Sequence, residues 1–560
     1  MMRHILDFLL FFFVSITLCL SCSGNEDPVK PDDPFIDVPI DPDFPTHPQD
    51  IDTEGAVVIT FKAKSIDVIN PFENEGVSIT CQEANVVVQS TVNYTVRYIL
   101  TGATSNGSLK IYSDTQFELI MNGVDIVNSN DPALNIQSGK KATLTLIEGT
   151  SNRLAGGIGF VSEGGSEKMK AAFYSRGQIV FSGEGRLTVI SRYRHAICSD
   201  DYIRINGGII TIPLSANDGL HANDYIEIND GTIKINAMGD GLDSEGYVMI
   251  SGGSIKITTT GDKSHGIKSE TEITIQSTGE IDITVEGDAS KAIRSKGNML
   301  ISQGTLNITT SGDACFDEEE AETSSNSGIR SKGNLIISGG NTVINSSGSG
   351  GKGISVDGDL TINNGEIAVT VTGEVYRQSN DNTKAKAIKN DGDMTINGGW
   401  IYADSKTDHA FDTKGSLTIS GGTVIGISRD LSKKGFECAK TFSITGGTLV
   451  GIGGSSGSPT ANACTQYVVN YAGGVSQNTI YHTASSTGIN ILTYQSPCTL
   501  SKAFMIFSSP DLERNMVYTL FSGGAVSGGS SFHGLYQGAT CTGGTTLSTF
   551  SISSMITNVN

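Results

Sequence analysis

The feature that most constrains the fold of this chain is a short motif that recurs through its middle. Each copy begins with a small anchor residue, Gly or Ala, and contains two short runs of alternating apolar and polar residues joined by a Gly-containing corner. The copies that start at Gly219 and Gly241 show the pattern most clearly. Most anchors are 22 to 26 residues apart, and the two longer steps, of 36 and 34 residues, carry insertions. The eleven anchors are Ala172, Ala196, Gly219, Gly241, Gly266, Ala292, Gly328, Gly353, Ala387, Ala410 and Gly435.

The motif predicts a solenoid of stacked β-strands. Alternation with a period of two places Ile, Leu and Val on one face of each run. A run of four residues cannot bury a core alone, whereas coils stacked about 4.8 Å apart form one continuous core. Leucine-rich repeats would show helical segments and a Leu/Asn signature, and a β-propeller blade needs about 40 residues. We therefore expect an all-β protein built on a parallel β-helix of about eleven regular coils, right-handed by the rule for parallel crossovers.

The extent of the repeat divides the chain. The regular β-helix is predicted over residues 171–454. Residues 55–170 contain strand-like runs without the motif. We expect an N-terminal cap and irregular first coils there, because an open solenoid end exposes unpaired strand edges. Residues 455–560 also lack the repeat, and they predict a small C-terminal β domain.

The first residues indicate export. Residues 1–21 combine a basic start with an apolar run too short to span a membrane, which predicts a signal peptide. Ser21-Cys22 resembles a bacterial lipobox and predicts acylation of Cys22; a plain signal peptide with incidental cysteines is the alternative. Residues 22–54 are rich in Pro and acidic residues and predict an extended tether. Because residues 22–27 resemble the export signals of Bacteroidota lipoproteins, we expect an outer-membrane, cell-surface lipoprotein that contacts the membrane only through its lipid.

The net charge of the chain is -21, with 38 basic and 59 acidic residues. Binding of nucleic acid requires clustered Lys and Arg against the phosphates, so this composition argues against a nucleic-acid partner. It suits a neutral partner, or an anionic one that is bound through metal ions or a local basic patch.

Acidic residues recur in the corner before successive anchors. They are Asp218, Asp240, Asp262 and Asp288, and Asp243 lies two residues after its anchor, close to Asp240. Ca²⁺ takes six to eight oxygen ligands from carboxylates, carbonyls and water, so this pattern predicts bound Ca²⁺ at these five residues. The alternative is that Asp stands there as an ordinary turn residue without an ion.

A second set of charged residues lies two positions after the anchors. The predicted ligand-binding residues of this column are His221, Lys268, Arg294, Arg330 and Lys389. In an acidic protein, basic groups repeated at one position of a solenoid suit an anionic sugar chain that lies along the helix axis. One alternative is an ordinary solvated face. Another is that the acidic insertion at residues 317–322 simply neutralises the column from the side.

Two aromatic residues, Trp400 and Tyr402, flank the inward Ile401 and are predicted to point outward. Two exposed rings form a flat platform on which sugar C–H faces stack, and both residues are therefore candidate ligand contacts. Ile425 and Val450 follow Tyr402 in later coils, so an apolar strip covered by the C-terminal domain is the alternative.

Motifs for catalysis have little support in the sequence, which has no HExxH and no Walker loop. We predict no catalytic residue. The runner-up hypothesis is a calcium-dependent polysaccharide lyase acting on uronates, with Lys268 as base beside Asp240, Asp243 and Asp262. A third hypothesis is a structural or adhesive cell-surface stalk.

Several stretches resemble the bacterial carbohydrate-binding domain-containing β-helix family. They are residues 119–126 (LIMNGVDI), 171–183 (AAFYSRGQIVFSG), 217–224 (NDGLHAND) and 509–524 (SPDLERNMVYTLFSGG). The resemblance implies a calcium-binding β-helix, similar in shape to pectate lyases, that binds cellulosic or uronate-containing plant polysaccharide without demonstrated catalysis. It also implies calcium sites at Asp218, Asp240 and Asp243. The expected protein is therefore a surface-anchored, calcium-binding polysaccharide-binding protein.

Overall fold

A computed structural model describes residues 47–160, 167–318, 322–378, 381–455 and 457–560. The predicted signal peptide, Cys22 and most of the predicted tether lie outside these residues. In the described part of the chain, no helix has the length and apolar character needed to cross a membrane.

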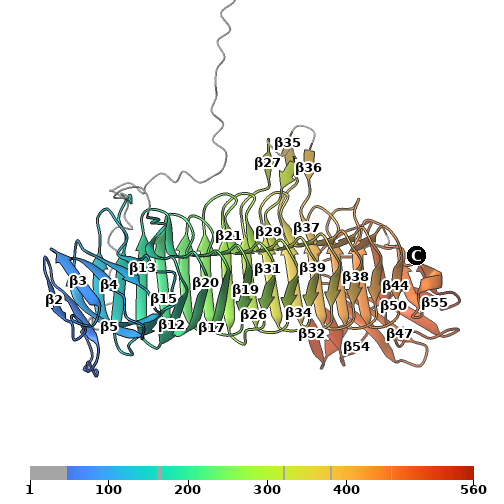
Figure 1. Cartoon of the computed structure of the whole chain (residues 1–560). Helices are drawn as coiled ribbons and strands as arrows, with labels where there is room; N and C mark the ends of the chain where they lie inside the picture. The colour runs from blue at the N-terminus through green and yellow to red at the C-terminus, as the bar shows by residue number, and fades with distance from the viewer. Residues whose placement is uncertain (1–46, 161–166, 319–321, 379–380, 456) are drawn as a thin grey trace, which may run out of the picture.

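The chain forms an elongated β-solenoid of about 14 turns, with its strands running across the long axis (Figure 1). Two large sheets, of 29 and 15 strands, run along the body. Strands of successive turns pair in parallel: β17 (Tyr225–Ala237) pairs with β20 (Ser254–Thr259), for example. The prediction of an all-β parallel β-helix is confirmed.

The 15-stranded sheet contributes one short strand to each turn and carries the repeat anchors. Its strands are β3 (Val77–Gln82), β4 (Asn85–Ser90), β6 (Ser108–Ser113), β8 (Leu134–Ile136), β11 (Ala171–Ser175), β14 (His195–Ser199), β16 (Leu220–Ala222), β18 (Leu242–Ser244), β21 (His265–Ser269), β24 (Lys291–Ser295), β29 (Ser327–Ser331), β32 (Lys352–Val356), β37 (Lys386–Asn390), β40 (Phe411–Thr413) and β43 (Phe436–Cys438).

Alternating side chains build the core, as the repeat requires. Ile233 and Ile235 of β17 pair with Ile255 and Ile257 of β20, and all four side chains are buried. Equivalent residues of successive turns continue these columns into one hydrophobic cluster that runs through the solenoid. Burial of these columns at about 25 cal/mol per Å² of apolar surface is the main force that holds the turns together.

The corners between strands carry a side-chain ladder. At one corner, the Oδ1 atom of an Asp accepts a hydrogen bond from the backbone N–H of the next turn: Asp262 from Asp288 at 2.9 Å, and Asp288 from Asp313 at 2.7 Å. A second series forms equivalent hydrogen bonds at another corner, where Asn334 Oδ1 accepts the backbone N–H of Asp359 at 2.9 Å. We call these series the corner ladders. They hold neighbouring turns in register outside the regular strand pairing.

Residues 55–170 differ from the predicted irregular coils. Strand β5 (Val96–Thr104) pairs in parallel with both β1 (Val57–Phe61) and β7 (Phe117–Val127), in the same sheet as the later turns. Among the described residues of this region, antiparallel pairing is confined to β2 (Ile66–Ile69) against β1 and to β3 against β4. The solenoid therefore has more turns than the eleven that carry the repeat, because backbone pairing does not need the anchor motif.

Two hairpins stand out from the body on the same side (Figure 1). One consists of β27 (Cys315–Asp317) and β28 (Glu322–Ser324), and the other of β35 (Tyr376–Gln378) and β36 (Asp381–Thr383). They are the insertions in the two long steps of the repeat, and the chain continues from them into β29 and β37. The backbone N–H of Phe316, in the first hairpin, donates to the hydroxyl of Tyr376, in the second, at 3.3 Å. The insertions therefore place both hairpins beside the 15-stranded sheet.

The C-terminal part forms an antiparallel sheet of six strands against the last turns. Its strands are β52 (Ser530–Phe532), β53 (Leu535–Gln537), β48 (Asn490–Gln495), β47 (Ile480–Ser485), β50 (Val517–Ser522) and β55 (Thr545–Ser551). A separate apolar cluster joins this part to the outer surface of the solenoid, with Ile425 and Val450 fully buried in it. The final strand of the stack, β45 (Thr448–Gly453), pairs with the antiparallel β49 (Phe504–Ser508).

Candidate functional site

The outer face of the 15-stranded sheet carries a column of mostly charged side chains, two residues after each anchor from Gly219 onward. Strand pairing places Asp243 beside both His221 and Lys268, and Lys268 beside Arg294. We call this line of residues the trailing column. The strand register agrees with the order in which the sequence aligns these residues. Its members are His221, Asp243, Lys268, Arg294, Arg330, Ser355, Lys389, Asp412 and Glu437.

A second column, directly before the anchors, was missed in the sequence. The backbone N–H of Gly241 donates to the carbonyl of His265 at 2.8 Å, which aligns Asp240 with His265, and strand pairing continues the line to Lys291. We call this line the leading column. Its signal in the sequence is a fixed offset of one residue before each anchor. Its members are His195, Asp218, Asp240, His265, Lys291, Ser327, Lys352, Lys386, His409 and Lys434.

The structure separates Asp262 and Asp288 from the other predicted metal ligands. Each lies four residues before its anchor, whereas Asp218 and Asp240 lie one residue before theirs. Both side chains are exposed and belong to a corner ladder. The prediction that they share a metal site with Asp218 and Asp240 is wrong, because the extra residues before these anchors move them away from the leading column.

Asp218, Asp240 and Asp243 do come together, and they are surrounded by cationic partners. Lys268 Nζ lies 3.1 Å from Asp240 Oδ2 and 3.0 Å from Asp243 Oδ1. His221 Nδ1 lies 2.8 Å from Asp243 Oδ2. Three acidic groups from neighbouring turns are thus linked through the side chains that lie between them. We define the carboxylate cluster as His195, Asp218, His221, Asp240, Asp243 and Lys268.

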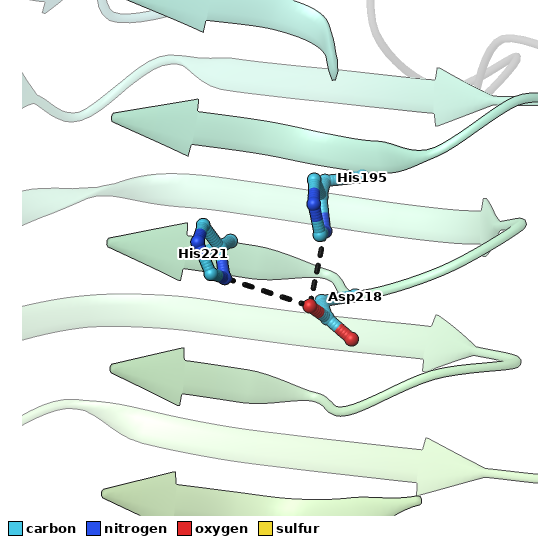
Figure 2. Close-up of side chains that lie close together, drawn as sticks. All are labelled: His195, Asp218 and His221. Carbon is cyan, nitrogen blue, oxygen red and sulfur yellow. Dashed lines mark ion pairs between the residues drawn. The ribbon is translucent and has the colours of Figure 1, made fainter. Parts of the chain in front are cut away.

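Asp218 contacts two histidines at one end of this cluster (Figure 2). Its Oδ2 atom is 3.0 Å from His195 Nδ1 and 3.6 Å from His221 Nδ1. The donor atoms of the three residues lie within 4.8 Å of one another, and a mixed nitrogen and oxygen set suits zinc better than calcium. However, the two rings stack 4.6 Å apart at 17°, so a metal in the plane of one ring lies out of the plane of the other. The geometry fits ion pairs better than metal ligation.

Burial and charge shift the protonation equilibria of this cluster. Burial disfavours the imidazolium of His221, but hydrogen bonds and charges from Asp218 and Asp243 outweigh it and raise its pKa to about 10. Burial likewise opposes ionisation of Asp218, yet the neighbouring histidines hold the pKa of this carboxyl well below its usual range. Burial and the charge of Asp218 raise the pKa of Asp240, and Lys268 opposes that shift. His221 and Asp218 therefore form a charged pair at neutral pH.

The carboxylates that the family resemblance assigns to calcium have no free oxygen in this arrangement. Asp218 Oδ1 accepts the backbone N–H of Asp240 at 2.7 Å, and Asp240 Oδ1 accepts that of His265 at 2.6 Å. Their other oxygens, and both oxygens of Asp243, face histidine or Lys268. Because Ca²⁺ needs six to eight oxygens, these residues do not fit the ion while Lys268 stands among them.

The same contacts bear on the runner-up catalytic residue, Lys268. Burial disfavours its charge, but Asp240 and Asp243 outweigh this effect and raise its pKa above the usual value. A general base must be unprotonated near the working pH. Lys268 holds its proton and is a poor base for a lyase reaction.

The remaining basic residues of the trailing column are paired at their outer ends. Arg294 lies 3.6 Å from Glu270, and Lys389 lies 2.9 Å from Asp391. Arg330 donates two hydrogen bonds of 2.7 Å to Asp357, an arrangement that fixes the plane of the guanidinium group. These three predicted ligand contacts lie on one face of the sheet. Arg294 and Arg330 are one turn apart and Arg330 and Lys389 are two turns apart, at about 4.8 Å per turn.

Trp400 and Tyr402 lie beneath the C-terminal part of the chain. The ring of Tyr402 is 6% exposed and stacks on His533 at 3.9 Å, and Trp400 packs edge-on against Phe532 at 5.4 Å. The Tyr402 hydroxyl donates to Asp404 at 2.8 Å. The prediction of an exposed sugar platform is therefore wrong for this pair, because their column of apolar side chains is covered by the six-stranded sheet.

A family model and a curated relative that are similar to this chain carry the same description. A family model described as "Carbohydrate-binding domain-containing protein" matches residues 76–315 and 258–430. A curated protein of Acetivibrio thermocellus with the same description is 29% identical over 149 residues, which cover 26% of this chain and 50% of that protein. The chain thus matches about half the length of this relative.

A solved structure is also similar. It is titled as the polysaccharide lyase-like protein from C. thermocellum, gadolinium derivative, and is 26% identical over 45% of this chain and 96% of that one, with a TM-score of 0.38. The family model, in contrast, spans more than half of the chain and covers both columns of the charged face up to residue 430. On this match, the chain belongs to the carbohydrate-binding domain-containing family.

Proposed function

We propose that this protein binds a polysaccharide along the outer face of the 15-stranded sheet and does not cleave it. The observation that carries the proposal is the pair of leading and trailing columns, which present polar and charged groups at every turn along the long axis. A polysaccharide is itself a repeating chain, so a linear series of hydrogen-bonding groups suits it better than a single pocket. The family description and the name of the Acetivibrio relative support a carbohydrate partner.

The face is prepared for binding by its internal contacts. Arg330 is held by two hydrogen bonds to Asp357, and Lys268 is held between Asp240 and Asp243. Side chains that are already ordered lose little conformational entropy when a ligand contacts them. The rigid strands beneath them keep the spacing along the face constant. Both properties favour the binding of an extended chain.

Absence of catalysis is part of the proposal, because Lys268 keeps its proton between two carboxylates. The purified protein should release no ultraviolet-absorbing unsaturated uronate from polygalacturonate. Formation of such products, lost in Lys268→Ala, would instead establish the lyase function.

Retardation of the protein in gels that contain embedded glycans tests binding directly. We expect retardation by at least one glycan, with neutral hydroxyethylcellulose and acidic polygalacturonate as the first two probes. The variant Arg294→Ala/Lys389→Ala should bind at least about tenfold more weakly, as loss of two contacts of the ordinary strength predicts. The matched control is Lys234→Ala/Lys256→Ala, which removes two exposed lysines from neighbouring strands of the other sheet.

Equal weakening in the control variant would show that net charge, and not this face, determines binding. No retardation of the unmodified protein by any glycan would favour a structural or adhesive stalk.

We further propose that Cys22 carries the lipid that anchors the protein at the cell surface, as its lipobox-like context suggests. In cells, Cys22→Ser should move the protein from the membrane fraction to the soluble fraction, whereas Cys81→Ser should not. Retention of Cys22→Ser in the membrane fraction would contradict lipid anchoring at this residue.

A further inference from the structure

The middle of the charged face has an excess of positive charge. The leading column there contains His265, Lys291 and Lys352, and Arg294 and Arg330 stand beside them in the trailing column. The protein as a whole is strongly acidic, so this concentration is local. Ser327 is buried in the column between the two lysines.

Lys291 and Lys352 differ from the other lysines of these columns in their partners. Within the described residues, neither has a carboxylate within ion-pair distance, whereas Lys268 and Lys386 each lie beside two aspartates. Lys291 is 9% exposed and donates to the carbonyl of Ala289 at 2.6 Å and to Ser324 Oγ at 2.7 Å. An ammonium group has three donors, so these contacts leave one donor over.

Lys352 has similar surroundings, two turns further along. It donates to the hydroxyl of Ser325 and lies 3.4 Å from Thr383 Oγ1. Ser324 ends β28 and Thr383 ends β36, so the bases of the two projecting hairpins lie against the two ammonium groups. The backbones of the two lysines are about 9.6 Å apart at two turns of strand spacing, with Ser327 between them. One carboxylate or sulfate group contacts both where the two long side chains converge above Ser327.

Charges around these lysines oppose their ionisation. Burial, followed by the charges of Arg294, Arg330, Lys352 and Lys263, lowers the pKa of Lys291 to about 7.

For Lys352 the causes are burial, then Lys389, Lys386 and Arg330, against which Asp408 acts weakly, and its pKa is also lowered to about 7. His265 adds no charge, because burial, followed by the charges of Lys291, Arg294 and Lys268, holds its pKa well below the usual value. Its Nδ1 accepts the backbone N–H of Lys291 at 3.2 Å.

We propose that Lys291 and Lys352, beneath the two hairpins, form a subsite for one anionic group of the polysaccharide, either the carboxylate of a uronic acid or a sulfate ester. This inference rests on the proposed function and names the class of sugar that the face selects. An anion placed here supplies the negative partner that the described surroundings lack, and it accepts the remaining N–H of each ammonium group. Charge-assisted hydrogen bonds of this kind are about twice as strong as neutral ones.

The alternative is a purely structural role, in which both lysines only hold the hairpins in place through Ser324, Ser325 and Thr383. Two variants separate the roles. Lys291→Met/Lys352→Met keeps most of the length of both side chains and removes their charge, whereas Ser324→Ala removes one hairpin contact and keeps the charge. A purely structural role predicts that both variants lower the thermal stability and leave the preference between anionic and neutral glycans unchanged.

The test compares three probes on the full chain: polygalacturonate, dextran sulfate and neutral hydroxyethylcellulose. For the anionic probe that binds, the Kd of Lys291→Met/Lys352→Met should rise at least about tenfold, which corresponds to 1.4 kcal/mol. The Kd for the neutral probe should change less than about twofold. The charge-matched control Lys234→Met/Lys256→Met should behave like the unmodified protein. Which of the two polyanions binds distinguishes a uronate site from a sulfate site.

The pH dependence gives a second readout. Binding of an anion favours the charged lysines, so affinity for the anionic probe should fall about tenfold for each lysine required between about pH 6 and about pH 8. The double variant should lose this dependence. If the neutral probe binds and the double variant keeps the full affinity for both polyanions, the subsite is refuted while the proposed function stands. If no probe binds the unmodified protein, the proposed function itself fails.

Discussion

The carboxylate cluster and the lysine pair occupy the same two columns of one sheet, and they differ in how their charges are balanced. In the cluster, every oxygen of Asp218, Asp240 and Asp243 faces a protein donor. A few turns away, Lys291 and Lys352 contact only hydroxyl and carbonyl oxygens within the described residues. The fold supplies equal positions in both places. The residue types alone decide whether the side chain at a position pairs within the protein and stabilises the solenoid, or keeps a hydrogen-bond donor available for a ligand.

The largest effect should come from breaking the cluster. In Asp243→Asn, His221 and Lys268 lose an anionic partner while they remain largely buried. Removal of one partner of a buried ion pair costs about 3 to 5 kcal/mol, and the partial exposure of these groups places the expected loss near the lower bound, at about 3 kcal/mol. Denaturant unfolding measures this change in the free energy of unfolding.

Asp262→Asn is the matched control for that experiment. Its Oδ1 can still accept the N–H of Asp288 in the corner ladder, and the side chain is exposed, so the change should stay within about 0.5 kcal/mol. An equal loss in both variants would mean that the cluster has no special role in stability.

The two regions should respond to pH in opposite directions. The pKa of His221 is raised in the folded protein, so its stabilising contribution is complete below about pH 6.5 and is lost as the pH rises through about 10. The pKa values of Lys291 and Lys352 are lowered to about 7, so the unfolded chain binds more protons between about pH 7 and 10.5, and these groups make stability rise there.

Variants separate these opposing contributions. Between about pH 7 and 10, Lys291→Met/Lys352→Met should lose stability more steeply than the unmodified protein, and His221→Gln less steeply, each by about 1 kcal/mol or more. Thermal unfolding at a series of pH values measures both slopes. If stability changes with pH equally steeply in all three proteins, the pKa shifts of His221, Lys291 and Lys352 are refuted.

The smallest effect is expected from calcium. Because Lys268 stands among the oxygens of the cluster, the melting temperature should be the same in Ca²⁺ and in a chelator, to within about 1 °C, as expected when no ion binds the folded state. A calcium-dependent rise that Asp240→Asn abolishes would show that the ion displaces Lys268, and it would restore the calcium sites that the family resemblance implies.

Much of this fold could be predicted because the repeat is local and periodic. The offset of two residues after each anchor correctly aligned His221 with Asp243 and Lys268, since strand pairing follows the anchors. The same logic failed for Asp262 and Asp288, which were aligned by residue type and not by distance from the anchor. Counting from the anchors would have identified the leading column, including Lys291 and Lys352.

Other features depend on contacts between distant segments, which a repeat cannot reveal. Tyr402 and His533 stack although 131 residues (402 to 533) separate them. The placement of the two hairpins beside the lysines likewise follows from the path of the chain and not from their own sequences. Parallel pairing in residues 55–170 escaped prediction because backbone hydrogen bonds form there without the anchor motif.

The corner ladders have a consequence for how this surface can be changed. Asp313 Oδ1 accepts the backbone N–H of Ser349 at 2.6 Å, and Asp359 Oδ1 accepts that of Asp393 at 2.8 Å, so each bond closes around one of the hairpins. The length of the enclosed segment therefore does not set the spacing of the turns. Loops of other sizes can be grafted between these residues, and natural variation at the hairpins can change the surface beside the lysines while the solenoid is inherited unchanged.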